Sequence, residues 1–256
     1  RVSRGLGDVY KRQGRNIALT TYGEALQNAL TPVLKTLHQI PTQLQQMALE
    51  REKTIRLNVL AASTLVTQAL ISYKKDHDGL HFRLIQNSQC EDADITVFTR
   101  ENFQIPTDTK ERYELFKERI FLAVPHNSPY ASEESVRLQD FAHEDFISLS
   151  GSRSIRTICD RYCMQAGFVP HIIYESDSPD TVKNLIASGL GVGFWPHYTW
   201  GMDSMEQIRL LPIAEPTCQR AIILQLHRHA RGQEAVCSFY AFLSRYLRQL
   251  KAAEQH

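Results

Sequence analysis

Short apolar segments alternate with longer amphipathic ones from Thr54 onward, and this order restricts the fold more than any other feature of the sequence. A period of two with many β-branched residues is typical of strands, whereas a period of 3.6 indicates helices. The expected strands are 54–61, 80–86, 93–99, 118–125, 145–150, 171–176, 191–196, 208–213 and 221–228. Strands that alternate with helices predict an α/β fold with mostly parallel sheets, covered on both faces.

The order of these segments also predicts that the region has two lobes. Residues 54–125 and 218–250 are expected to form the first lobe, because the last strand and the closing helix return to it. Residues 126–217 are expected to form the second lobe. A cleft between two such lobes would be a natural place for a ligand.

Residues 22–52 precede the lobes and are expected to form one long helix. Its apolar residues recur at alternating steps of four and three, at Leu26, Leu30, Val33, Leu37, Ile40, Leu44 and Met47. This is the 3.5-residue period of a coiled-coil seam, so we expect the helix to self-associate. The alternative is that the stripe packs on the chain's own domain. Thr21 and Glu24 fit a capping box, and Pro32 and Pro41 argue against a straight rod.

No motif of a known catalytic site occurs in the sequence: G-x-S-x-G, H-E-x-x-H and the P-loop are all absent. The run "GLGVGF" (189–194) has the glycines of a dinucleotide-binding loop, but it follows a helix and enters a strand, the reverse of what phosphate binding needs. We interpret Gly189 as the end of a helix, and Gly191 and Gly193 as positions of close packing. The sequence therefore predicts no enzyme, no cofactor and no metal site.

Composition excludes several further classes of protein. Five cysteines at irregular spacing favour free thiols over a disulfide framework. A formal net charge of +1 confines any nucleic-acid contact to a local surface. No apolar run approaches the ~20 residues that a membrane helix needs.

Hydroxyl side chains follow several of the expected strands at their carboxyl ends. They are Ser63 and Thr64, Thr99, the run Ser150-Gly151-Ser152, and Ser176. In α/β sheets, ligands bind outside these strand ends, and a helix N-terminus there favours an anion. Each hydroxyl could simply cap a helix. Together they predict a cleft for a small polar molecule or a carboxylate.

Three segments of the sequence resemble the LysR-type transcriptional regulators. "GRNIALTTYGEAL" is similar to the family's R-x-x-x-L-T-x-x-G segment, where the wing of a winged helix-turn-helix enters the linker helix. "FLAVPHNSPYA" resembles a crossover strand and the loop after it. "CMQAGFVPHIIYESDSPDTVKNLIASGLGVGFWP" resembles the A-G-F-x-P to G-L-G-V-x-x-x-P part of the effector domain.

The resemblance implies a two-lobed fold like that of the periplasmic binding proteins, which binds a small-molecule effector and controls a DNA-binding head. By position, it places the effector contacts on Ser63, Thr64, Thr99, Ser150, Gly151, Ser152 and Phe194. Arg15, and less directly Arg12, would contact DNA phosphates. The implied partners are DNA, a homodimer or homotetramer, and RNA polymerase, all in the cytoplasm and without a membrane.

The first residues fit this scheme only in part. Residues 14–21 are interpreted as the remnant of the wing, so the chain is expected to lack most of the DNA-binding head. Residues 1–13 are interpreted as a non-native leader that resembles translated adaptor sequence; the alternative is a genuine end of the head. For function, the alternative to a regulator is a free-standing two-lobed solute-binding protein without catalytic activity.

Overall fold

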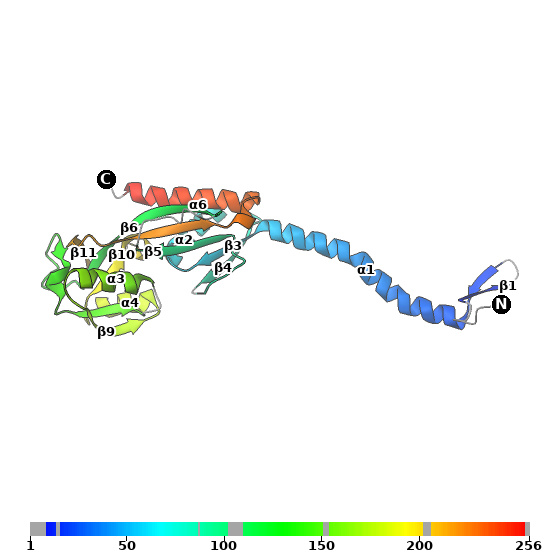
Figure 1. Ribbon diagram of the computed structural model, residues 1–256, viewed down its shortest axis with the longest axis horizontal. Helices are drawn as coiled ribbons and strands as arrows, with labels where there is room; N and C mark the ends of the chain where they lie inside the picture. The colour runs from blue at the N-terminus through cyan, green and yellow to red at the C-terminus, as the bar shows by residue number, and fades with distance from the viewer. Residues whose placement is uncertain are drawn as a thin grey trace. The chain divides into compact units, whose positions relative to one another are not determined.

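The computed structural model describes residues 9–13, 16–86, 88–101, 110–150, 154–201 and 206–253. The chain divides into two compact units, Arg1–Lys53 and Thr54–His256 (Figure 1). The predicted residues Arg15, Gly151 and Ser152 lie outside the described residues.

The first unit consists of a β-hairpin followed by a long helix. Strands β1 (Tyr10–Gln13) and β2 (Asn16–Leu19) pair antiparallel, and helix α1 runs from Thr21 to Lys53. Thr20, not Thr21, caps α1: its Oγ1 accepts a hydrogen bond from the amide of Gly23 at 3.2 Å. The predicted capping box is therefore wrong by one residue.

Helix α1 continues through both prolines, although each one lacks the amide that would bond to the preceding turn. Thr36 Oγ1 donates to the carbonyl oxygen of Pro32 at 3.0 Å. The helix bends along its length in Figure 1 but is not interrupted. The predicted long helix is thus confirmed, and the prolines curve it rather than end it.

The second unit contains an eight-stranded sheet and a separate two-stranded one. The order in the large sheet is β4-β3-β5-β12-β6-β11-β7, with β10 also paired to β6. These strands are β3 (Thr54–Val59), β4 (His81–Gln86), β5 (Ile95–Arg100), β6 (Arg112–Pro125), β7 (Val136–Arg137), β10 (Gly193–Pro196), β11 (Ile208–Glu215) and β12 (Gln219–Leu226). Strands β8 (Asp145–Leu149) and β9 (His171–Ser176) form the small parallel sheet.

The large sheet is mixed, so the expectation of mostly parallel sheets is wrong. Strand β3 pairs parallel with β4 and β5, and β11 pairs parallel with β7. Every other pair in this sheet is antiparallel. The physical reason is β6, whose 14 residues pair first with β12 and then with β10 and β11. Only residues 118–125 of this strand were predicted.

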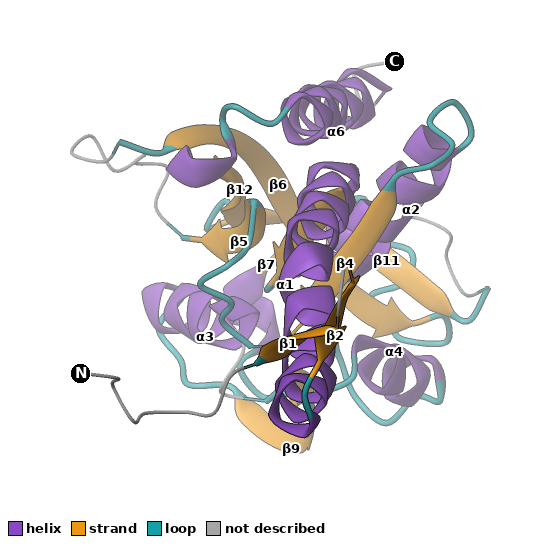
Figure 2. Cartoon of the chain, turned by 90° about the vertical axis from the view of Figure 1, so that its right-hand side faces the viewer, coloured by secondary structure: helices purple, strands orange, loops and turns teal. Residues whose placement is uncertain are grey.

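Helices cover the strands on several sides. They are α2 (Ser63–Lys74), α3 (Ser154–Gln165), α4 (Pro179–Ala187), α5 (His197–Trp200) and α6 (Glu234–Ala253), with 3₁₀ turns at Leu138–Phe141 and Arg228–Ala230. Helix α6 packs against α2 and β6, whereas α4 packs on β8 and β9 (Figures 1 and 2). As predicted, Ser178 caps α4, and Gly189 follows it with φ +78°.

The apolar side chains of this unit form two hydrophobic clusters. One contains Ile55, Phe116 and Ile222 together with α2 and α6. The other contains Ile120 and Cys218 together with α3 and α4. Strand β6 contributes to both clusters, so the chain passes from one core to the other within this strand. It passes back between Cys218, just before β12, and Ile222 within β12.

Candidate functional site

A cavity of about 680 Å³ lies in the second unit, where strand ends meet helix N-termini. We call it the cleft. Its walls come from the turn between β3 and α2, the ends of β4 and β5, the starts of α3 and α4, α5, and the start of β12. The polar residues that line it include Ser63, Thr64, Thr99, Ser154, Thr199, Lys183 and Arg220.

The N-terminus of α2 forms one wall of the cleft. Ala62 precedes the helix in the left-handed conformation (φ 61°, ψ 35°), and no side chain caps the helix there. Among the described residues, the hydroxyls of Ser63 and Thr64 have no hydrogen-bond partner. The first amides of a helix are unpaired and carry partial positive charge, so this wall suits an anion or a polar oxygen. A non-glycine residue in the left-handed region is strained, which is a frequent property of functional sites.

Thr99 lies near the end of β5 and contacts the start of α3 in the wall of the cleft. Its Oγ1 is 2.7 Å from Oγ of Ser154, the first residue of α3. The side chain is buried, with 7% of Thr99 exposed. This hydroxyl pair joins a strand of one hydrophobic cluster to a helix of the other. A ligand bonded to Thr99 would therefore contact the boundary between the two clusters.

The structure brings together only some of the predicted site residues. Ser63, Thr64 and Thr99 line the cleft. Ser150 does not line it; its amide donates to the carbonyl oxygen of Ser176 at 2.9 Å and extends the pairing of β8 with β9. Phe194 borders a separate, small cavity inside the second cluster, with its ring 5.8 Å from that of Phe146. A contact from any of these residues to an effector stays a prediction.

The cleft also contains two basic residues that the sequence did not single out. Lys183 on α4 reads as a solvent-facing residue of an amphipathic helix, and Arg220 stands at the start of an apolar strand. An arginine next to the apolar run 221–224 of a strand is unusual, because charged residues are rarely buried unless they are paired. That is the one signal in the sequence that could have identified Arg220.

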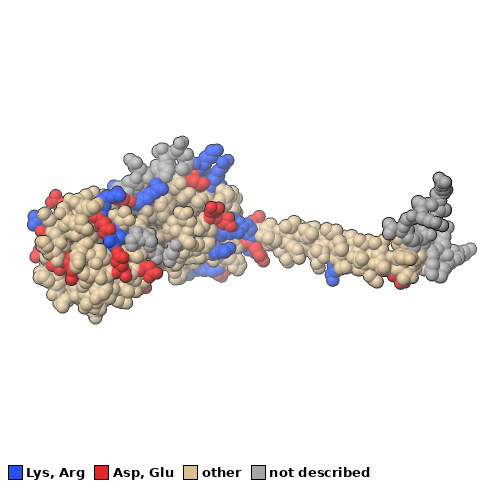
Figure 3. Space-filling model, turned by 60° about the horizontal axis from the view of Figure 1, so that its bottom comes forward, with Lys and Arg blue, Asp and Glu red and all other residues tan. Residues whose placement is uncertain are grey.

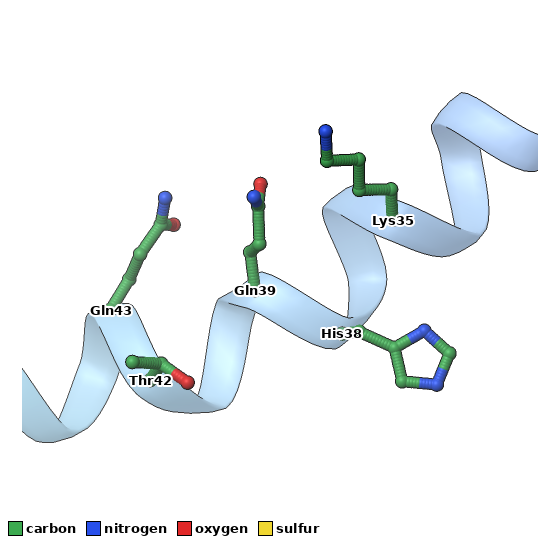
Figure 4. A pocket seen from close by; sticks show the side chains of 5 residues that line it. All are labelled: Lys35, His38, Gln39, Thr42 and Gln43. Atoms are coloured by element: carbon green, nitrogen blue, oxygen red, sulfur yellow. The ribbon is translucent and has the colours of Figure 1, made fainter.

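A second depression lies on α1 alone and is bordered by Lys35, His38, Gln39, Thr42 and Gln43. In Figure 4, Lys35, Gln39 and Gln43 point to the same side of the helix. A single helix cannot enclose a ligand, so we interpret these residues as the polar face of α1 rather than as a binding cavity. They lie apart from the apolar stripe from Leu26 to Met47.

Arg12, one of the two predicted DNA contacts, lies in the hairpin of the first unit. It stands in β1 opposite Ile17 of β2. Arg15 comes between the two strands in the sequence and is outside the described residues. DNA contacts of both arginines remain predictions.

The described part of the chain contains neither a candidate metal site nor a membrane-spanning helix. No group of three His, Cys, Asp or Glu residues there could hold a metal ion. No described helix is long and apolar enough to cross a membrane. All five cysteines are free, and burial raises the pKa of the Cys163 thiol to about 12.

The mixed sheet, the two clusters and the cleft define an α/β effector-binding domain that follows a long N-terminal helix. The family model "LysR substrate binding domain" matches residues 49–248, and the chain belongs to this family. It is a LysR-family transcriptional regulator with a C-terminal effector-binding domain, and it is not an enzyme. The predicted resemblance and function are confirmed, and the alternative of a free-standing solute-binding protein is set aside.

Three known proteins illustrate this relationship. The transcriptional dual regulator GltC of Bacillus subtilis (strain 168) is 24% identical over 255 residues, which cover 95% of this chain and 84% of GltC. The effector binding domain of QuiR in complex with shikimate has a TM-score of 0.62 at 18% identity, covering 77% of this chain and 97% of that one. The CcmR regulatory domain of Synechocystis in complex with 2-PG has a TM-score of 0.64 at 15% identity, covering 75% and 95%. At these identities, the two structures show the shared fold.

Proposed function

We propose that the cleft is the effector site of this regulator and that it binds a small polar molecule, such as a carboxylate. Ser63, Thr64 and Thr99 would donate hydrogen bonds to it, together with the first amides of α2. The observation that carries this proposal is the uncapped N-terminus of α2, whose unpaired hydroxyls open onto a cavity of about 680 Å³. The structures of QuiR with shikimate and of CcmR with 2-PG support a small acidic molecule as the effector of a domain with this fold.

Residues 54–125 and 218–250 form one lobe in this proposal, and residues 126–217 form the other. Binding would change the balance between arrangements of the lobes and so the way DNA is held. Ser150, Gly151, Ser152 and Phe194 remain candidate contacts for the ligand-bound arrangement. In the sequence, residues 150–152 closely precede α3, whose first residue, Ser154, bonds to Thr99.

DNA binding is typical of the LysR family, and in this proposal the hairpin β1–β2 belongs to the wing of a DNA-binding head. Arg12 and Arg15 would contact phosphates, which position a protein on DNA but do not read its sequence. The proposed place of action is therefore the cytoplasm, where the DNA is.

The proposed oligomer is a homodimer formed through α1, with homotetramers formed through the effector domains. The apolar stripe of α1 supports it, because Leu37, Leu44 and Met47 are 55%, 59% and 66% exposed within one chain. Between residues 25 and 49 the helix has a single Lys or Arg and no Asp or Glu (Figure 3). A second copy of the helix would cover this surface at little electrostatic cost.

The effector site is tested by Ser63→Ala and Thr64→Ala in the full chain. Calorimetry with shikimate, 2-PG and a panel of small carboxylates should give a ligand for the wild-type protein. Each variant should weaken its binding about 3- to 10-fold, since a neutral hydrogen bond contributes roughly 0.5–1.5 kcal/mol. Ser132→Ala, at an exposed serine outside the cleft, is the matched control and should bind normally. Unchanged affinity in both cleft variants would refute the assignment.

A further inference from the structure

Arg220 and Glu118 form a buried ion pair at the wall of the cleft. They stand opposite each other in the pairing of β12 with β6, and Arg220 Nε lies 2.6 Å from Glu118 Oε2. Glu118 is fully buried, and the side chain of Arg220 is 3% exposed. Thr199 of α5 completes the group: its amide donates to Glu118 Oε1 at 2.6 Å, and its Oγ1 accepts from Arg220 Nη2 at 2.9 Å.

This arrangement holds the guanidinium in place but does not use all of it. An arginine has five N–H donors in a fixed fork. The bonds to Glu118 and Thr199 use Nε and Nη2, and no other described residue accepts from Nη1. Arg220 borders the cleft, so these donors are available to a group inside it. A buried ion pair adds little to stability, which makes a role in binding the better explanation for this one.

Lys183 of α4 supplies a second cation to the same cleft. Its side chain is only 15% exposed, and its Nζ lies 5.2 Å from the ring centre of Trp195 and 5.7 Å from that of Trp200. Nζ donates one hydrogen bond, at 3.1 Å, to the carbonyl oxygen of Trp200. The nearest carboxylate, that of Asp180, is 3.8 Å away and 86% exposed, so water screens it.

The charges that border the cleft are therefore unequal in effect. Among the described residues that border it, the two cations, Lys183 and Arg220, are mostly buried, whereas the two acids, Asp177 and Asp180, are exposed to solvent. Coulomb interactions are stronger where water is excluded, so the two buried cations dominate the electrostatic potential inside the cleft. Glu118 neutralises part of Arg220, and nothing buried neutralises Lys183 among the described residues.

We propose that Arg220 and Lys183 bind the acidic group of the effector, so that the cleft selects an organic acid over its neutral analogue. Glu118 and Thr199 are positioning residues that keep the guanidinium turned toward the cleft. This proposal rests on the proposed function, because it assumes that the effector binds there. It adds the residues that set specificity. These residues are on α4 and β12, whereas the hydroxyls of Ser63 and Thr64 are on α2.

The test compares acids with their primary amides on the full chain at constant ionic strength. The probes are benzoate and benzamide, nicotinate and nicotinamide, and succinate and succinamide, followed by thermal shift and calorimetry. For at least one pair, the wild-type protein should bind the acid at least 10-fold more tightly than the amide. Lys183→Met should reduce this ratio 10-fold or more through the affinity for the acid alone. Lys74→Met is the matched control, because Lys74 also donates to a backbone carbonyl but lies outside the cleft.

Arg220→Lys keeps the positive charge beside Glu118 but removes the fork, so it should fold and also reduce the ratio. Thr199→Val removes one acceptor of Arg220 and should weaken acid binding without changing the net charge. Equal affinity for acid and amide, or an unchanged ratio in Lys183→Met and Arg220→Lys, would overturn the proposal. If Ser63→Ala still weakened binding in that case, the effector site would stand and only its selectivity for acids would fall. If no probe binds the wild-type protein, this proposal fails together with the proposed function.

Discussion

Glu118 and Arg220 meet at the place where the effector-binding unit changes from one hydrophobic core to the other. On β6, Phe116 belongs to one cluster and Ile120 to the next, with Glu118 between them. Along the partner segment, Cys218, just before β12, belongs to one cluster and Ile222 of β12 to the other, with Arg220 between them. The ion pair therefore joins β6 to β12 at the boundary between the two cores, and it does so beside the cleft.

The first prediction concerns the energetic coupling of this pair. Glu118→Leu should destabilise the protein by about 3–5 kcal/mol, because it leaves the Arg220 charge buried without a partner. The double change Glu118→Leu with Arg220→Met should be markedly more stable than Glu118→Leu alone, since no charge then remains buried. Urea unfolding followed by circular dichroism gives both values. A double variant as unstable as the single one would contradict the coupling.

The second prediction concerns the glycine at the start of β10. A Cβ on Gly193 would lie 2.7 Å from Cδ1 of Ile186 and 2.8 Å from the carbonyl oxygen of Ile147. Gly193→Ala should therefore cost roughly 1–3 kcal/mol, as overpacking does in a filled core. Gly232→Ala is the control, because nothing lies within 4 Å of the Cβ it would add. Equal stability of the two variants in urea would show that the strand can move aside.

The third prediction concerns the buried thiols. Burial raises the pKa of Cys163 and of Cys218 to about 12, and it raises that of Cys159 as well. At pH 8, only about one in 10,000 of the Cys163 and Cys218 thiols is a thiolate, the form that reacts. Iodoacetamide at pH 8 should modify the partly exposed Cys90 and Cys237 but leave the other three intact. Peptide mass spectrometry reads each site, and urea should expose all five; rapid native labelling of Cys163 would contradict the packing of α3.

The sequence predicted local structure well wherever a few neighbouring residues decide it. Ser178, Pro179 and Gly189 mark the ends of α4, and Gly193 fits close packing because its neighbours leave no room for a Cβ. The direction of the strands could not be predicted in this way. The pairing of β6 with both β12 and β11 joins residues about a hundred positions apart, and alternation of strands with helices carries no information on it.

The cleft could be predicted only in part, because some of its residues follow from local sequence patterns and others from long-range packing. Hydroxyls at strand ends can be read from a pattern, and Ser63, Thr64 and Thr99 do line the cleft. Arg220 and Lys183 enter it only because β12 lies beside β6 and α4 lies near α5. The resemblance to the family places Phe194 at the effector, whereas in this structure its half-buried ring stacks on Phe146 beside a separate small cavity, so its contact with an effector stays a prediction.

The fourth prediction concerns the apolar stripe of α1. Changing Leu30, Leu37 and Leu44 together to glutamine removes three apolar side chains that are 44%, 55% and 59% exposed in a single chain. Leucine and glutamine have similar helix propensities, so α1 should remain a helix. If α1 forms the dimer, this triple variant should lose self-association, because a coiled-coil seam depends on its apolar positions.

Sedimentation equilibrium over a range of concentrations measures this directly, and the molar mass of the triple variant should fall to that of a smaller assembly. The control changes the polar face instead, with Gln39→Ala and Gln43→Ala, and should keep the wild-type mass. The thermal midpoint of the effector-binding unit should be the same in all three proteins, since its two cores contain no residue of α1. A triple variant with unchanged mass, or a control that dissociates equally, would place the dimer contact elsewhere.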